Sequence, residues 1–402
     1  MKADVRPPVT QHFLTLVAAL LSMVGPFTID SYLPSFPDIE RDFGVDRALL
    51  SQSLSAYLAA FAVSTLAWGP LSDRFGRRRV IRFSLLLFLA ASIGCALSPS
   101  IDAFLLLRVL QGVAASGGFI AARAMIRDAH SAEAAHRAMS QLTLVFALAP
   151  AIAPVLGGWL HDHFGWRSVF WFLAVFGALL LLLMRFVRET LAPELRQSVR
   201  PSAVARVYRS IASNRRYLRL ILTQAFGFAG LFLYIAGAPT VIYDFLGLDS
   251  QGFALQFIPT VAGLMLGAGI SARLAHRWPP TRTIALGLCL SGLAVAGNLL
   301  QLVLLQASSL SVLAPLVLYA CGLAVAMPPL TVSALDCFPA NRGSAASVQG
   351  FVQMSINAGV AGLAVPLLHS QLGHFVLGQA AFLALAQMLW WLPARARRAV
   401  RV

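Results

Sequence analysis

The sequence predicts an all-helical membrane protein with twelve transmembrane helices. Its 402 residues are 58% hydrophobic and only 12% charged, and the apolar residues come in runs of about twenty, the length that a helix needs to cross roughly 30 Å of hydrocarbon. No segment shows the alternating apolar and polar residues of a transmembrane barrel. Because lipid offers no partner for backbone polar groups, the runs must be helices.

Twelve runs are long enough to span a membrane. In chain order they cover residues 12–34, 48–71, 80–98, 103–125, 138–160, 167–187, 217–242, 251–272, 282–305, 309–333, 344–368 and 373–393. A polar, basic segment follows the sixth run. The predicted organisation is therefore an N-terminal six-helix half at 1–187, a linker at 188–216 and a C-terminal six-helix half at 217–402.

The two predicted halves resemble each other weakly. A shift of two hundred residues places Gly69 on Gly269 and Arg77 on Arg277, each in the loop after the second span of its half. Two six-helix units in pseudo-symmetric duplication, with a binding site at their interface, are the plan of many secondary transporters.

The distribution of the basic residues indicates how the chain is oriented in the membrane. Of 31 basic residues, 27 fall on one side of the predicted spans, and only Arg41, Arg47 and Arg167 fall on the other. The positive-inside rule places both termini and the linker in the cytoplasm. The net charge of +15 therefore does not indicate nucleic acid as a partner.

Asp30 and Arg108 are the two charges that we place at membrane depth. A charge there costs at least a few kcal/mol, so such residues usually have a function. Both lie about four or five residues from the outer end of their spans, so their depths match to a few Å, and we expect them to meet. An acid that faces a fixed arginine can act as a proton switch. The alternatives are a purely structural ion pair and a hydrogen bond from Gln111 to Asp30.

The loop after the second span holds the most specific motif, Gly69-Pro-Leu-Ser-Asp73-Arg74-Phe-Gly76-Arg77-Arg78-Arg79. Gly69 permits close helix approach and Gly76 permits a turn, whereas Asp73 can cap a helix N-terminus or pair with an arginine. A cluster of arginines that only fixes topology is the alternative.

This loop resembles the signature G-x-L-a-D-r-x-G-r-r-x of the major facilitator superfamily. The segment Thr28-Ile-Asp30-Ser-Tyr32-Leu-Pro34 is similar to the first-helix signature T-D-x-Y-L-P of its Bcr/CflA drug-resistance subfamily, and Arg108-Val-Leu-Gln111-Gly112 is similar to the family pattern R-x-x-Q-G. The resemblance implies that the loop latches the two halves together on the cytoplasmic side. It also implies that Asp30, Arg108 and Gln111 couple transport to protons.

The fifth span ends with Ala149-Pro150-Ala-Ile-Ala153-Pro154-Val-Leu-Gly157-Gly158. Small residues recur on one helical face beside two prolines, which predicts close packing and a bend. The segment resembles the family's antiporter motif g-x-x-x-G-P-x-x-G-G, with alanine at both earlier glycine positions. A kinked packing helix without directional meaning is the alternative.

In this family, helices 1, 4, 7 and 10 line a central cavity. Together with Asp30, the residues that we expect to line it are Tyr57, Gln224, Phe228, Phe232 and Tyr234. Aromatic residues at helical spacing also occur in cores and facing lipid.

The resemblance implies a monomeric exporter of the bacterial inner membrane that exchanges small, largely apolar or cationic drugs for protons. A proton-coupled carrier of one dedicated metabolite is the second hypothesis. A membrane-embedded enzyme is the third, but no nucleophile motif appears and no histidine lies well inside a span. The four cysteines stand singly, so the sequence predicts no disulfide, metal or cofactor.

Overall fold

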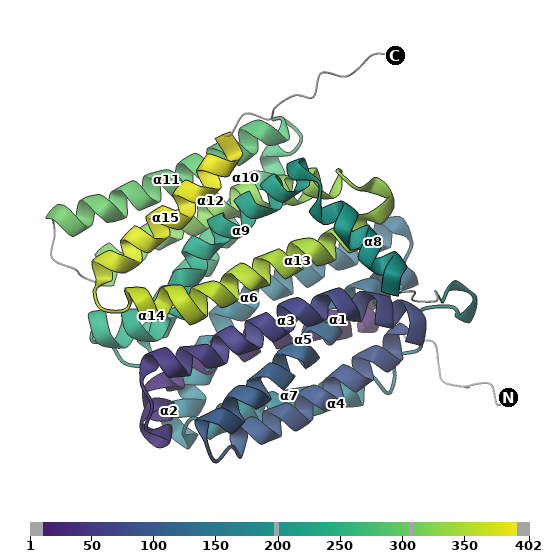
Figure 1. Cartoon of the computed structure of the whole chain (residues 1–402), viewed down its shortest axis with the longest axis horizontal. Helices are drawn as coiled ribbons and strands as arrows, with labels where there is room; N and C mark the ends of the chain where they lie inside the picture. The colour runs from purple at the N-terminus through teal and green to yellow at the C-terminus, as the bar shows by residue number, and fades with distance from the viewer. Residues whose placement is uncertain (1–10, 197–200, 305–308, 392–402) are drawn as a thin grey trace.

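The computed structural model describes residues 11–196, 201–304 and 309–391, which form a bundle of helices without a strand in those ranges (Figure 1). Eleven of the described helical segments are long and apolar enough to cross a membrane, and a shorter apolar helix of 17 residues occupies the sixth predicted span. The predicted class, all-helical with twelve transmembrane helices, is confirmed. These helices are α1 (Gln11–Asp30), α3 (Arg47–Phe75), α4 (Arg77–Ala96), α5 (Ile101–Ala129), α6 (Ala132–Phe164), α7 (Arg167–Leu183), α9 (Arg215–Ala236), α10 (Gly252–Leu274), α11 (Pro280–Leu304), α12 (Ser309–Leu335), α13 (Arg342–Gly359) and α15 (Leu372–Trp391).

Short elements connect or extend these helices. They are the 3-10 turns η1 (Leu33–Ser35), η2 (Pro193–Leu195) and η4 (Pro339–Asn341), the π-helical turns η3 (Thr240–Phe245) and η5 (Val360–Ala364), and the helices α2 (Phe36–Phe43), α8 (Pro201–Ala212) and α14 (Val365–Leu368).

The first helix ends earlier than the sequence predicts. α1 stops at Asp30, and the chain continues as a turn, η1 and α2. Pro34 and Pro37 lie just beyond the end. Because proline has no amide hydrogen to donate to the fourth residue before it, each removes one bond of an α-helical ladder, and two so close together favour a break here. Asp30 is thus a helix-terminal residue rather than one inside a continuous span.

The helices pack in two groups that lie side by side (Figure 1). In one group α5 packs against α1, α3 and α4, and in the other α12 packs against α9, α10 and α11. The main contacts between the groups are those of α13 with α3 and of α10 with α6. A site near α1, α3 and α5 therefore lies beside the surface where the groups meet.

The helix α8 joins the two groups on the side that the charge pattern predicts to be the inner one. It packs against α13, and the Tyr208 hydroxyl donates to the Leu66 carbonyl of α3 at 3.0 Å. Burial raises the pKa of the Tyr208 hydroxyl, which keeps this donor protonated.

Candidate functional site

Arg108 of α5 lies in an aromatic setting. Its side chain is completely buried, and its guanidinium carbon lies 4.4 Å from the ring centre of Tyr32 and 4.7 Å from that of Tyr57. A guanidinium over an aromatic face gains attraction that grows as water is excluded. The rings therefore offset part of the cost of burying the charge.

Hydrogen bonds complete this setting. Arg108 Nη1 donates to Gln111 Oε1 at 2.8 Å, and Nη2 donates to the Thr28 carbonyl at 3.2 Å. Gln111 Nε2 in turn donates to Ser92 Oγ of α4 at 2.8 Å. Thr28 is two residues from the end of α1, where the last four carbonyls have no partner within the helix. Arg108 thus closes the C-terminal end of α1.

Asp30 does not meet Arg108, so this prediction is wrong. Asp30 is only 3% exposed, its Oδ1 atom has no hydrogen-bond partner, and among the described residues no ion pair joins it to an arginine. The reason is the end of α1, which offers the Thr28 carbonyl to the guanidinium. Gln111 does not hold Asp30 either, because its amide binds Arg108 and Ser92.

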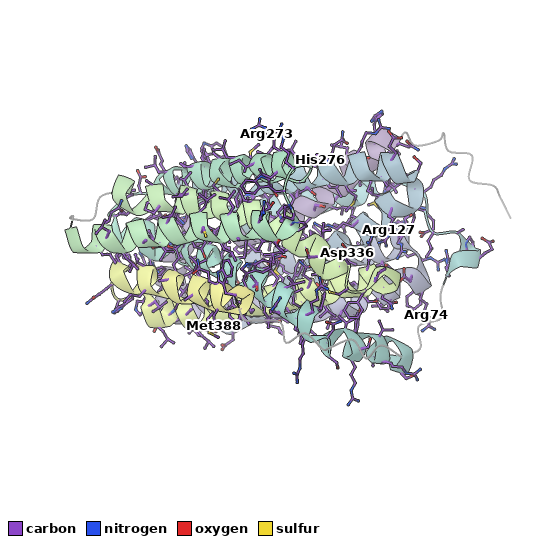
Figure 2. The ribbon with its side chains drawn as sticks, turned by 90° about the horizontal axis from the view of Figure 1, so that it is seen from above. Arg74, Arg127, Arg273, His276, Asp336 and Met388 are labelled. Carbon is purple, nitrogen blue, oxygen red and sulfur yellow. The ribbon has the colours of Figure 1, made fainter. Side chains whose placement is uncertain are left out.

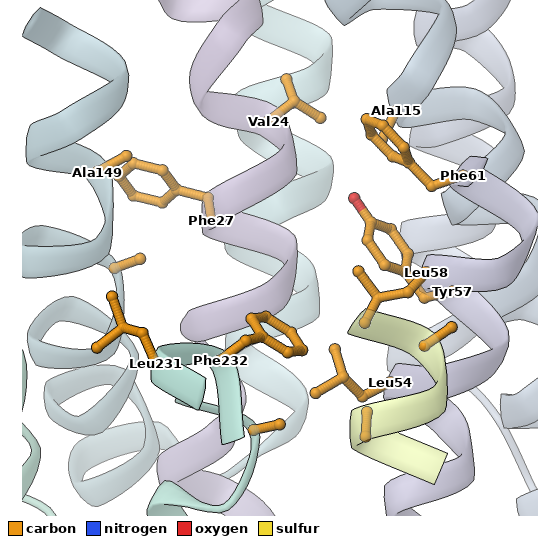
Figure 3. Close-up of a cluster of buried hydrophobic side chains, with 14 of the residues drawn as sticks. Val24, Phe27, Leu54, Tyr57, Leu58, Phe61, Ala115, Ala149, Leu231 and Phe232 are labelled. Atoms are coloured by element: carbon orange, nitrogen blue, oxygen red, sulfur yellow. The ribbon is translucent and has the colours of Figure 1, made fainter. Parts of the chain in front are cut away.

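Tyr57 of α3 lies beside Arg108, with its ring centre 4.7 Å from the guanidinium carbon. Its buried hydroxyl lies near the Thr28 side chain, two residues before Asp30. Figure 3 shows the hydroxyl pointing from α3 into the space toward α1. Tyr57 therefore faces both Arg108 and the end of α1 that carries Asp30.

The glycines of α6 hold α1 close to this point. A Cβ atom at Gly157 would overlap the carbonyl of Ser31, the residue after Asp30. Ala149 and Ala153 are completely buried on the same helix, which continues through Pro150 and Pro154. Gly158 lies beside Ser250, in the loop before α10. The motif packs α6 against the end of α1 and reaches the second group of helices.

The loop after α3 forms an ion-pair network. Arg77 pairs with Asp73 and with Asp128, at 2.8 Å to the Asp128 Oδ2 atom, and donates to Ser72 Oγ at 2.6 Å. Arg74 lies over the Phe75 ring, 5.1 Å from its centre. Asp73 is therefore an arginine partner rather than a helix cap.

The cap of α4 is Glu189, which the sequence did not indicate. Its carboxylate accepts from the amides of Arg77 at 2.8 Å and Arg78 at 3.2 Å. Gly76 has a φ of 95°, and a Cβ atom there would overlap the Glu189 carboxylate. The expected close helix approach at Gly69 is wrong, because nothing lies within 4 Å of a Cβ atom placed there. Among the described residues, the ion pairs of this loop all lie within the first group of helices.

The predicted cavity residues separate into two sets. Phe228 and Phe232 stack at 6.2 Å, and Figure 3 shows Phe232 reaching from α9 toward Leu54 of α3. Gln224 Oε1 accepts from Thr331 at 3.1 Å and Gln349 at 3.0 Å. The third aromatic residue, Tyr234, lies elsewhere.

Tyr234 is completely buried within the second group. Its hydroxyl accepts from Asn298 at 3.3 Å, and its ring lies 5.9 Å from that of Phe375. It packs inside the helices and lines no opening in this structure.

The sequence also missed a closure at the helix ends that the charge pattern predicts to be the outer ones. Arg47 of α3 pairs with Glu40 and, at 2.9 Å, with Asp244 of η3. Tyr243 donates to the Pro34 carbonyl at 2.7 Å, and burial raises the pKa of its hydroxyl. These residues stand at a helix start, in loops and in short turns, where the sequence pattern gives no sign of their pairing. The two groups are thus joined on the outer side.

The helices, the buried charges and the closure at one side define a multi-pass membrane transporter. The family model described as Major Facilitator Superfamily matches residues 16–366. The chain belongs to this superfamily, whose members are transporters rather than enzymes.

Curated relatives agree with this assignment. The chain is 34% identical to "Uncharacterized MFS-type transporter YdgK" of Bacillus subtilis over 65% of both chains. It is 28% identical to "Bicyclomycin resistance protein homolog" of Haemophilus influenzae, over 65% of this chain and 66% of the relative. It is 28% identical to "Multidrug resistance protein D" of Escherichia coli over 96% of both. The first two matches thus span about two thirds of each relative, and the resemblance to the Bcr/CflA subfamily is confirmed.

Solved structures agree on the fold. A D-xylose–proton symporter aligns with a TM-score of 0.72 at 16% identity, over 95% of this chain and 98% of the symporter. A human organic anion transporter, MFSD10, aligns with a TM-score of 0.69 at 20% identity. At such low identity the likeness concerns the fold alone.

Proposed function

We propose that this chain exports small, largely apolar or cationic drugs across the bacterial inner membrane in exchange for protons. In this proposal the halves at 1–187 and 217–402, joined by the linker at 188–216, alternate between inward and outward access as a monomer. The basic loops support cytoplasmic termini. The relatives named for resistance to bicyclomycin and to multiple drugs support the task.

The observation that carries the proposal is the buried carboxyl group of Asp30, whose Oδ1 atom has no hydrogen-bond partner among the described residues. A buried carboxylate without an ion pair is costly, and binding a proton removes that cost. Reopening to water on the other side lets the proton leave. Because Asp30 ends α1, beside Ser31 and the Gly157 contact, a change in its charge acts on the helix that α5 and α6 hold in place.

The inner loop is proposed to gate this cycle. Its ion pairs lie within the first group, while Arg47 and Asp244 join the groups on the outer side. This arrangement suits a state that is closed to the outside. A latch from this loop to the second half would form when the outer contacts open.

The test is proton movement in energised inside-out vesicles, followed with a pH dye while antibiotics and lipophilic compounds are added. We expect several unrelated compounds to dissipate the gradient with the wild type and none with Asp30→Asn, since an amide cannot carry a proton. Asp102→Asn, an exposed acid in the first turn of α5, should behave like the wild type. Full activity of a well-folded Asp30→Asn would contradict the mechanism.

The second candidate is a carrier of one dedicated metabolite. The polar cluster of Gln224, Thr331 and Gln349 favours it, because such a cluster can select a hydroxyl or amide group. A response to one polar metabolite, with no response to the drug panel, would support this function instead.

A further inference from the structure

Arg123 of α5 is a charged residue inside the predicted fourth span that the function described above does not use. It lies six residues, or about 9 Å along the helix, before the inner end of α5 at Ala129. Arg123 is exposed although it lies inside the span. Together with the direction of its helix face, this exposure places it at an opening between helices.

The helical positions give the same orientation. Arg123 follows Phe119 by four residues, so both lie on one face of α5. The Phe119 ring is 6.0 Å from that of Phe61 on α3 and 5.9 Å from that of Phe146 on α6. This face therefore points into the protein between α3 and α6.

The three rings form an aromatic platform below the arginine. The Arg123 guanidinium carbon lies 4.2 Å from the Phe119 ring centre. Stacking holds the guanidinium plane but leaves its five N–H donors at the edge of the plane. The guanidinium is thus held in one orientation, and its paired N–H groups can bind a carboxylate-like group. The aromatic rings beside it can contact the apolar body of the same ligand.

The donors of Arg123 are free to bind such a ligand. Among the described residues, Arg123 makes no ion pair or hydrogen bond, and its guanidinium contacts only the Phe119 ring. Arg108 on the same helix differs, because Gln111 and the Thr28 carbonyl accept from its two Nη atoms. Arg108 thus has a structural role, whereas the N–H donors of Arg123 can bind a ligand.

The charge inside the first group of helices agrees with an anionic ligand. Among the described residues, no acid forms an ion pair with Arg123, and Arg108 lies fifteen residues, or about 22 Å along α5, away from it. The Arg123 guanidinium is thus a positive charge without a counter-ion. It would repel a cation that enters beside it.

We propose that Arg123 binds the anionic group of the exported compound, which makes small apolar or aromatic acids the preferred substrate class. This inference rests on the proposed export function and replaces the expected preference for cations. Such a ligand would place its anionic group on the guanidinium and its apolar body against Phe119 and Phe61.

The test compares two xanthene dyes of similar shape and opposite charge, fluorescein and rhodamine 123. Each is titrated onto the full-length protein in nanodiscs by fluorescence anisotropy, with empty discs subtracted. We expect the wild type to bind fluorescein more tightly. Arg123→Gln should weaken fluorescein binding about tenfold, the effect of losing a charged hydrogen bond, without weakening rhodamine 123 binding. Arg123→Lys should lose less than Arg123→Gln.

The matched control is Arg127→Gln, an exposed arginine in the last turn of the same helix (Figure 2). It should bind fluorescein like the wild type. A wild-type preference for rhodamine 123, or equal weakening of fluorescein by Arg123→Gln and Arg127→Gln, would overturn the proposal. An unchanged melting temperature of each variant shows that folding is not the cause.

Transport in inside-out vesicles separates this inference from the export function. Export of rhodamine 123 with no binding of fluorescein would overturn the anion site and leave export standing. Selective fluorescein binding through Arg123, with no uphill movement of either dye, would overturn export and leave the binding site supported.

Discussion

At the residue scale, a buried arginine requires partners that replace water. Arg108 has two aromatic rings, the Gln111 amide and the Thr28 carbonyl, and its Nε atom has no hydrogen-bond partner among the described residues. Its surroundings hold the charge without an acid, because neutral acceptors and ring faces replace water around it. Asp30 is consequently left without a fixed counter-ion, which is the condition that a proton carrier needs.

Replacing Gln111 tests this interpretation. Gln111→Leu removes the acceptor for Arg108 Nη1 and the donor to Ser92 while keeping a similar volume. Leaving a buried charged donor unsatisfied costs about 1–3 kcal/mol, so we expect a lower melting temperature of the purified protein. The exposed Gln141 of α6 is the control, and Gln141→Leu should leave the melting temperature nearly unchanged. Equal melting temperatures of the two variants would show that Gln111 does not hold Arg108.

The sequence identified Asp30, Arg108 and Gln111 but not their pairing. Their chemical types and their depth follow from residue identity and helix rise. Their partners depend on where α1 ends, because that end supplies the Thr28 carbonyl. Arg123 was missed because its position near the inner end of a span looks like a topology signal.

At the element scale, the contact of α6 with α1 controls the position of Asp30. A Cβ atom at Gly157 would meet the backbone of Ser31 rather than a flexible side chain. The sequence predicted this close packing from the spacing of small residues. It could not predict which helix is the partner, since small residues permit close approach from any neighbour.

A single methyl group is therefore expected to disturb this contact. Gly157→Ala should force α1 and α6 apart and cost about 1–3 kcal/mol, the range for overpacking a tight core. We expect a lower melting temperature and reduced transport. Gly297→Ala in α11 is the control, because nothing lies within 4 Å of its Cβ position, and alanine there should be neutral or stabilising by up to about 1 kcal/mol. The same loss in both variants would mean that the Ser31 contact is not special.

At the scale of the whole molecule, ion pairs are arranged differently on the two sides. The outer pair of Arg47 with Asp244 joins the two groups, whereas the inner pairs of Arg77 stay within one group. The composition and charge of the sequence predicted the helices and their direction. They did not predict which side is closed, because that depends on contacts between loops that lie far apart in the chain.

This asymmetry predicts the effect of removing one outer charge. Asp244→Asn removes the only charged partner of Arg47 in the second group among the described residues, and it should shift the protein toward an outward-open state. Exposed ion pairs contribute about 0.2–1 kcal/mol, so the ratio of the two states should change by up to about fivefold.

The measurement is the distance between two spin labels on the outer ends of α3 and α10. The labels are attached at Leu49→Cys and Leu255→Cys, which are exposed positions, and the native cysteines are replaced. Asp42→Asn is the matched control, because Asp42 is 46% exposed against 49% for Asp244 but pairs with Arg167 within the first group. A longer distance in Asp244→Asn alone supports the closure, whereas unchanged distances in both variants would show that Asp244 does not hold the outer side shut.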